Sequence, residues 1–432
     1  MSDITIQLAV FVLGIVAFFS ARKSTGVWLN PVSILVVCFF APLFFSLFRL
    51  AGIQSSSWQY QTYVAIWAAI GAWLIFPPIL LAARGKVKVL DGPLDGELLR
   101  TNEFRKMVRL FALVVVTAYY LGNYLQAGTP LPILNPEAAY SLHTVFPPVI
   151  RFFARANPAA VGLLFILYWA QRRKFDLFFL AFVFITPLSR LSRIDLALAL
   201  VVILILHSVY PLIKVNAKRL LLLGVVFLAL AIGGAELGNL RTNRFGVYEV
   251  KYENAIGWIP DVVGPASVFP IAYGYFPLSF ENFDAFVRQF HGGYMLGFYS
   301  FDWLFTGFVK LNWVPGFAQL QSENAYFEPV SSAANVPTAL FPFYADYGPV
   351  GMALPMMVYL IFWVYLFYRS RESAMFTLLF ALYSGGFALA SFQALIAASI
   401  LVHQVVEVLL LFWVVKRLIR RKAANGRALV GA

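Results

Sequence analysis

The chain has few charged side chains and a single cysteine. Asp, Glu, Lys and Arg make up 12% of its 432 residues, whereas hydrophobic residues make up 61% and the mean hydropathy is +0.78. A soluble domain carries about 25% charged residues, so this chain has too few charged side chains to cover the surface of a soluble protein of its length. The lone Cys38 excludes an intramolecular disulfide. The composition therefore predicts an integral membrane protein.

Sequence motifs that bind nucleotides or metal ions are also missing. The chain has no Walker A loop, no HExxH pair, no dinucleotide fingerprint and no DxD-like metal pair on its predicted outer side. Its four histidines are scattered, at His143, His207, His291 and His403. We therefore expect no cofactor and no metal ion. The net charge of +13 is explained by cytoplasmic flanks beside anionic lipid, so we expect membrane lipid and no nucleic acid as a partner.

Long apolar stretches recur along the whole chain, and backbone hydrogen bonding in lipid requires them to be helices. The fold class expected is all-α, a polytopic membrane helix bundle of about 11 transmembrane helices, with a large outer loop between the eighth and ninth spans. The expected spans are 4–21, 31–51, 61–83, 107–127, 157–171, 175–188, 195–213, 220–237, 347–368, 374–394 and 397–415.

The distribution of basic residues predicts the orientation. An outer N-terminus and a cytoplasmic C-terminus place most of the 33 basic residues on the cytoplasmic side, as the positive-inside rule requires. Three regions follow from this topology: an N-terminal bundle of spans one to eight over 1–237, an outer loop over 238–346, and spans nine to eleven with a basic tail over 347–432.

The outer loop 238–346 is rich in aromatic residues, Gly, Pro and Asn. A disordered linker would be poor in aromatics, so we expect a folded cap. Aromatic faces beside amide and carboxylate side chains suit the binding of sugars, and aromatic belts at the bilayer interface explain the same composition. Both interpretations stay open at this point.

Four arginines are expected near the outer mouth of the bundle. Arg190 and Arg193 lie in a tight hairpin after the short span 175–188, and Arg241 and Arg244 follow the eighth span. Guanidinium groups offer planar forks of donors to phosphate oxygens, so these residues are candidates to bind a lipid pyrophosphate. The alternative is that they are interfacial arginines whose heads reach water.

His403 and Glu407 are four residues apart, so they share a helix face inside the last span. Ionisable residues within a membrane are candidates for function. A proton relay here would favour a transporter, whereas a structural pair packed against a neighbouring helix is the alternative.

The segment from Asn335 to Gly351 reads NVPTALFPFYADYGPVG. It resembles the motif that leads into a late span of bacterial oligosaccharide repeat-unit polymerases, the Wzy-type O-antigen polymerases. The arginine hairpin, the number of spans and the late outer loop are also similar to that family. The related O-antigen ligases have a histidine at the start of the corresponding motif, and its absence here favours a polymerase.

The resemblance implies a metal-independent glycosyltransferase at the periplasmic face of the bacterial inner membrane. Its substrates would be undecaprenyl pyrophosphate-linked glycans, polymerised into O-antigen or a related surface polysaccharide, and a chain-length regulator protein would be a partner. The alternatives are a ligase-like lipid-linked sugar transferase and a transporter or flippase of lipid-linked oligosaccharide.

The resemblance also suggests roles for particular residues. The candidate bases are Asp346, Glu323 and His291, although Asp346 equally suits a helix cap or an ion pair. Hydrogen bonds to sugar or phosphate are expected from Asn335, Thr338, Tyr344 and Asn324.

Overall fold

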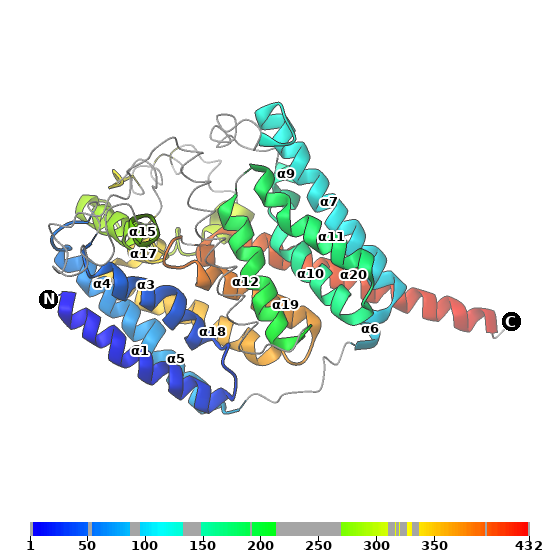
Figure 1. Cartoon of the computed structure of the whole chain (residues 1–432), viewed down its shortest axis with the longest axis horizontal. Helices are drawn as coiled ribbons and strands as arrows, with labels where there is room; N and C mark the ends of the chain where they lie inside the picture. The colour runs from blue at the N-terminus through cyan, green and yellow to red at the C-terminus, as the bar shows by residue number, and fades with distance from the viewer. Residues whose placement is uncertain are drawn as a thin grey trace. The chain divides into compact units, whose positions relative to one another are not determined.

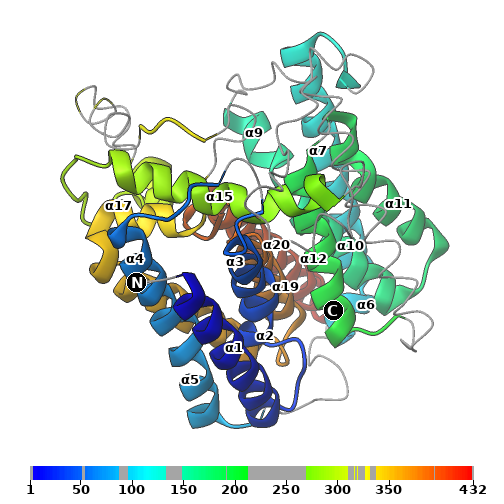
Figure 2. The same ribbon diagram turned by 60° about the vertical axis from the view of Figure 1, so that its left-hand side comes forward.

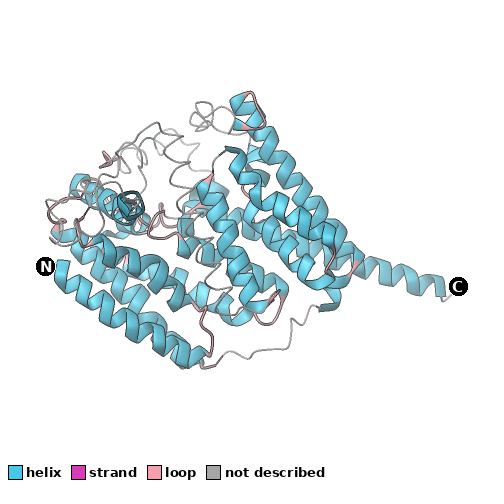
Figure 3. Cartoon of the chain, viewed as in Figure 1, coloured by secondary structure: helices cyan, strands magenta, loops and turns pink. Residues whose placement is uncertain are grey.

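The computed structural model describes residues 3–50, 54–86, 96–132, 148–190, 192–212, 269–309, 316, 319, 326–330, 337–393 and 395–430 (Figure 1). These residues form helices joined by turns, and no strand occurs among them (Figure 3). The expected all-helical fold class is therefore confirmed for this part of the chain. The contacts divide the chain into two compact units, each described here by itself.

Three helical segments are long and apolar enough to cross a membrane, within the residues that the structure describes. They are Asp3–Thr25, Tyr60–Arg84 and Asn102–Ala127. Shorter apolar helices cover Pro31–Ser46, Ile194–Val209, Ala353–Arg369 and Ala374–Ala388. A span needs about 20 apolar residues, so these helices are compatible with a membrane protein. The expected number of spans stays a prediction, because span 220–237 lies outside the described residues.

The first unit covers Met1–Val87, Ala217–Tyr365 and Gly386–Ser399. α1 packs against α2, α3 and α5, and α15 packs against α3, α4 and α17 (Figure 2). The bounds of the elements are α1 Asp3–Thr25, α2 Pro31–Leu35, α3 Ala41–Ser46, α4 Tyr60–Ile70, α5 Phe76–Arg84, α15 Phe269–Gln289, α17 Leu340–Gly351, and α18 Ala353–Arg369, which ends in the second unit.

Two π-helical turns interrupt apolar helices of the first unit just before proline residues. Val36–Phe40 precedes Pro42, and Gly71–Ile75 precedes Pro77. A proline lacks the N–H that continues the helical ladder, and a π-turn accommodates the altered hydrogen bonding. Both helices therefore continue through their prolines.

Trp73 lies in the aromatic core of the first unit and is completely buried. Its indole N–H donates to the carbonyl of Met356 at 3.3 Å. The ring centroids of Phe39 and Phe387 lie 5.2 and 5.6 Å from that of Trp73, and Trp363 stacks on Phe387 at 4.0 Å. These contacts join the two π-helical turns to α18 and to Phe387.

The second unit covers Lys88–Asn216, Leu366–Gly385 and Ile400–Ala432. Thr101 caps α7 by accepting the N–H of Phe104, and Gly128, at φ +67°, ends that helix. The elements are α6 Gly96–Arg100, α7 Asn102–Ala127, α9 Pro148–Ala154, α10 Asn157–Gln171, α11 Lys174–Ile185, a 3-10 turn Thr186–Arg190, α12 Arg193–Val209, α19 Ala374–Ala388, which ends in the first unit, and α20 Ser399–Val430, whose first residue belongs to the first unit.

Each compact unit is made of three separate segments that contact one another. The three expected regions were instead defined by the predicted membrane topology. The bounds 1–237, 238–346 and 347–432 therefore stay a prediction. Arg151 lies in the last turn of α9. The expected short span 175–188 is α11, which ends at Ile185 and continues into the 3-10 turn.

Candidate functional site

α15 is the central element of the candidate site in the first unit. Its side chains are buried from Pro277 to Val287. Glu281 and Asp284 lie on the face toward α3 and α4, whereas Phe283 and Phe286 contact residues of α17. α15 thus joins a polar layer to an aromatic layer.

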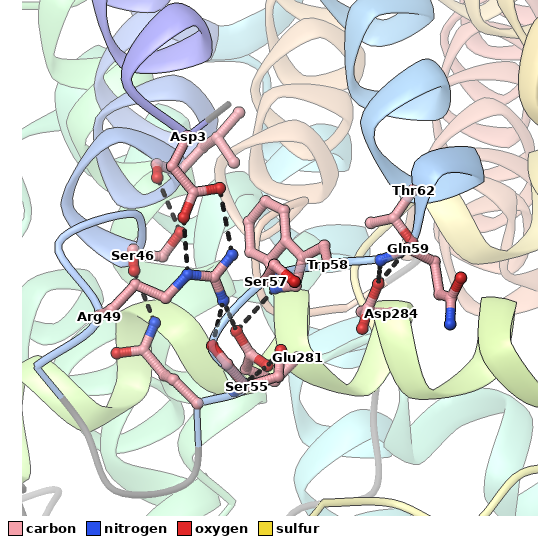
Figure 4. A network of polar contacts seen from close by, with 12 residues as sticks. Asp3, Ser46, Arg49, Ser55, Ser57, Trp58, Gln59, Thr62, Glu281 and Asp284 are labelled. Atoms are coloured by element: carbon pink, nitrogen blue, oxygen red, sulfur yellow. Dashed lines mark hydrogen bonds and ion pairs between the residues drawn. The ribbon is translucent and has the colours of Figure 1, made fainter. Parts of the chain in front are cut away.

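The polar layer is centred on Arg49, which follows α3 (Figure 4). Its guanidinium binds both carboxylate oxygens of Asp3, at 2.8 and 3.2 Å, and Glu281 Oε1 at 2.8 Å. It also donates to the carbonyl of Ser55 at 3.0 Å and lies 4.6 Å from the ring centroid of Trp58. These contacts hold Arg49 at a positive φ of 56°, a conformation that costs free energy unless the surroundings fix it.

Glu281 is 2% exposed and receives four hydrogen bonds. Besides Arg49, its donors are the N–H and hydroxyl of Ser55, each at 3.0 Å, and the indole N–H of Trp58 at 2.7 Å. Burial raises the pKa of the Glu281 carboxyl above its ordinary value, while Arg49 and the other donors act in the opposite direction. The buried carboxylate therefore depends on every one of these donors.

Asp284 binds the first turn of α4 (Figure 4). Its Oδ1 accepts the N–H of Gln59 and the hydroxyl of Thr62, both at 2.7 Å. Its Oδ2 accepts from Arg288 at 2.6 Å, and Arg288 also donates to the carbonyl of Ser57 at 2.7 Å. A carboxylate at a helix N-terminus satisfies free N–H groups and matches the helix dipole, so Asp284 fixes α15 to the start of α4.

The aromatic layer lies between α15 and α17. The ring centroid of Phe286 is 4.6 Å from that of Phe341 and 6.0 Å from that of Tyr344. Phe283 lies 5.7 Å from Tyr344 and Phe290 lies 5.8 Å from it. Tyr344, an expected hydrogen-bonding residue, is thus 4% exposed and surrounded by rings.

Asp346 lies in α17 and is completely buried. Its Oδ1 accepts the backbone N–H of Tyr299 at 3.1 Å, and its Oδ2 accepts the backbone N–H of Ser300 at 2.5 Å. The Ser300 hydroxyl donates to the carbonyl of Pro342 at 3.3 Å. Asp346 thus caps the backbone of a turn that is distant in sequence, and its expected role as a base stays a prediction.

The segment from His291 to Tyr294 precedes the turn that contains Tyr299 and Ser300. This exposed segment lies against α17 and is open to solvent. Tyr294 is 50% exposed, and His291 is exposed after the end of α15. The ring of Tyr294 stacks on Phe290 with centroids 5.7 Å apart. A Cβ on Gly348, which has a φ of +71°, would lie 2.7 Å from the Tyr294 ring. Gly348 therefore permits both the kink of α17 and the close approach of Tyr294.

The structure brings together some of the expected site residues and does not describe others. Asp346, Tyr344 and Thr338 belong to one buried region, where the Thr338 hydroxyl accepts the N–H of Leu340 at 3.2 Å. His291 lies in the exposed segment. The expected residues outside the described part of the chain are Glu323, Asn324, Asn335, Arg241 and Arg244.

The expected arginine hairpin belongs to the second unit, where the structure describes the helical backbone of Arg190 and Arg193 but not their side chains. Asn123 of α7 donates to the hydroxyl of Ser189 at 3.0 Å. Asp195 accepts from the hydroxyls of Ser192, at 2.7 Å, and Tyr119, at 3.4 Å. These bonds fasten both ends of the hairpin to the bundle.

The expected His403–Glu407 pair lies in α20. The His403 ring centroid is 5.3 Å from that of Phe152 in α9, and Gln404 donates to the carbonyl of Arg155 at 2.7 Å. Glu407 is 4% exposed, and neither of its carboxylate oxygens has a hydrogen-bond partner among the described residues. Glu407 therefore accepts no hydrogen bond from the His403 side chain among the described residues.

Sequence reasoning did not single out Arg49, Glu281 and Asp284. The available signal was local: Asp284 and Arg288 are spaced for an i,i+4 ion pair, and Glu281 lies one turn before them. Arg49 lies 232 positions from Glu281 in sequence. No periodicity could have joined residues so far apart.

The described residues include no cluster of three or more His, Cys, Asp or Glu side chains that could hold a metal ion. The polar layer can fix helices, and the half-exposed Tyr294 ring can contact the C–H face of a pyranose ring. In comparisons with known protein families, curated proteins and solved structures, nothing matches this chain.

Proposed function

We propose that this chain is a membrane glycosyltransferase that polymerises undecaprenyl pyrophosphate-linked repeat units. One observation carries the proposal: residues Leu340–Gly351 of the polymerase-like segment form α17, and Asp346 and Gly348 support the exposed segment with His291 and Tyr294. A motif that positions an exposed aromatic face gives a glycan a surface on which to stack. The site lies at the periplasmic face of the inner membrane in the topology with an outer N-terminus.

The proposed reaction needs a base and a site for the leaving group. A hydroxyl of the acceptor's terminal sugar attacks the anomeric carbon of the donor chain. The bond from that carbon to the pyrophosphate oxygen breaks, and undecaprenyl pyrophosphate leaves with the electron pair. His291 or Glu323 takes the hydroxyl proton. The guanidinium groups of Arg190, Arg193, Arg241 and Arg244 bind the pyrophosphate, so no metal is required.

Reconstitution with defined substrates tests this proposal. The purified full chain, in vesicles with lipid-linked repeat units and without added metal or nucleotide, should give a ladder of longer lipid-linked glycans. A ligase would instead transfer a unit once to a lipid A–core acceptor. Unchanged single units from a folded protein would contradict the polymerase.

A proton-coupled transporter of lipid-linked oligosaccharide is the second candidate, and Glu407 favours it. Burying a carboxyl group without a hydrogen-bond partner among the described residues costs free energy. Ionisable residues kept inside a membrane despite this cost are candidates for function. A transporter would move fluorescent lipid-linked oligosaccharide between leaflets without changing its mass, and Glu407→Gln would stop this movement. Movement that is absent from the wild type, or unaffected by Glu407→Gln, would contradict this candidate.

A further inference from the structure

α20 is longer than the apolar part of its sequence. It covers 32 residues, or about 48 Å of helix, whereas the hydrocarbon core of a bilayer is about 30 Å thick. Its apolar part ends at Val415, and basic residues begin at Lys416. Figure 1 shows the C-terminal part of α20 extending beyond α6 and α7. Lys416 therefore lies where the helix would leave the hydrocarbon.

An apolar groove of about 540 Å³ lies beside this transition. The first turn of α19 contributes Met375 to its lining, and α20 contributes Leu409, Leu410, Phe412, Trp413 and Lys416. Leu410 and Trp413 are 52% and 56% exposed. The volume is within the range of small-molecule sites, and its lining suits a hydrocarbon chain.

A stripe of cations continues from the groove along α20. Lys416, Arg417 and Arg420 follow Trp413 at spacings of three, four and seven, so all four residues share one face. All three cations are exposed. The part of the chain that the structure describes offers them no acidic partner, whereas Lys422 pairs with Glu103. The Arg417 guanidinium lies 5.2 Å from the Trp413 ring centroid, a pairing suited to the bilayer interface.

We infer that this groove and its cation stripe form a binding site for one anionic phospholipid. An acyl chain lies against Leu409, Leu410 and Trp413, and the phosphate binds Lys416, Arg417 and Arg420. The charge identifies the class of ligand, because an anionic headgroup compensates part of the charge of the three cations, whereas a zwitterionic headgroup adds no net negative charge. The proposal is independent of the polymerase reaction.

Native mass spectrometry of the full chain in mild detergent tests the site. The probes are dioleoyl phosphatidylglycerol and dioleoyl phosphatidylcholine, each titrated separately. The wild type should retain phosphatidylglycerol in preference to phosphatidylcholine. The variant K416Q/R417Q/R420Q should retain roughly a hundredfold less phosphatidylglycerol, with no change in phosphatidylcholine. Equal retention of the two lipids by the wild type would overturn the proposal.

Two further variants separate the site from general effects of charge and folding. K23Q/R84Q/K86Q removes the same charge from exposed positions of the first unit and should leave retention unchanged; an equal loss would overturn the proposal. M375W fills the groove, leaves the cations in place and should lower retention roughly tenfold. Unaltered retention by M375W would overturn the proposal, as would a wild-type dimer that this variant converts to a monomer.

Discussion

The carboxylate of Asp346 accepts the backbone N–H of Ser300 at 2.5 Å, across 46 positions of the sequence. Its other oxygen accepts the N–H of Tyr299. A side chain of α17 thus organises the turn that follows the exposed segment of His291 and Tyr294. We therefore expect Asp346, a candidate base from the sequence, to position this turn as well.

Asp346→Asn tests this role. The amide has one donor group, which would face one of the two backbone N–H donors, so that hydrogen bond would be lost. We expect the free energy of unfolding to fall by about 1–3 kcal/mol and protease cleavage between 291 and 301 to increase. Thermal unfolding in detergent and limited proteolysis measure these effects. A variant with wild-type stability and no polymerisation would support a catalytic base instead.

Arg49→Met should destabilise the first unit strongly. The change leaves Glu281 buried without its cationic partner, and breaking a buried ion pair in this way costs about 3–5 kcal/mol. Arg288→Met is the matched control, because Arg288 is 39% exposed and its pairing with Asp284 is screened by solvent. Thermal unfolding of both variants gives the comparison. Equal small losses would show that Arg49 does not hold α15.

Gly348→Ala should strain α17 through both its backbone and its contact with Tyr294. Alanine is disfavoured at a φ of +71°, and its Cβ would lie 2.7 Å from the Tyr294 ring. We expect a loss of about 1–3 kcal/mol in stability. Tyr294→Ala in the same chain removes the contact but not the backbone strain, so it should restore part of the loss. Full restoration would mean that the backbone contributes nothing.

Glu407→Gln should leave the stability of the protein equal or higher. The amide keeps the shape of the side chain and avoids burial of a charged carboxylate without a partner among the described residues. Gln404→Ala is the contrasting variant, since it removes the bond to the Arg155 carbonyl and should lower stability by about 1 kcal/mol. A marked loss of stability in Glu407→Gln would show that the carboxylate has a structural partner.

The sequence was sufficient for much of the helical fold. α10 has the expected bounds, 157–171, because Asn157-Pro158 begins it and an apolar run fills it before Arg172. α20 continues past the expected end at 415, because its basic residues are compatible with helix outside a bilayer. Hydropathy marks the part of a helix that lies in lipid and not its end.

The candidate site was less predictable than the helices. The Asn335–Gly351 motif identified Asp346, but the turn that it caps has no recognisable pattern of its own. In the sequence, Arg49 was visible only as a charge near the outer end of the expected span 31–51, and Glu281 only as a charge in the outer loop. Their pairing depends on α15 lying against α3 and α4 (Figure 4). Such contacts are decided by tertiary packing.

The arginine cluster gives the polymerase proposal a specific requirement. Arg190→Gln, Arg193→Gln, Arg241→Gln and Arg244→Gln remove charges expected to bind the leaving pyrophosphate. We expect chain growth to fall at least tenfold in two or more of these variants, with membrane insertion unchanged. Arg22→Gln is the matched control, because Arg22 lies in the last turn of α1, at the expected cytoplasmic end of that helix. Wild-type chain growth in all four variants would contradict pyrophosphate binding by these arginines.

The most direct test of the proposed function follows the length of the glycan itself. Wild-type protein in vesicles is incubated with lipid-linked repeat units and EDTA, and the products are separated by size. A regular ladder, each step one repeat unit longer and attached to undecaprenyl pyrophosphate, is the predicted result. Single repeat units that remain unextended, from protein shown to be folded by its thermal unfolding, would contradict the proposal.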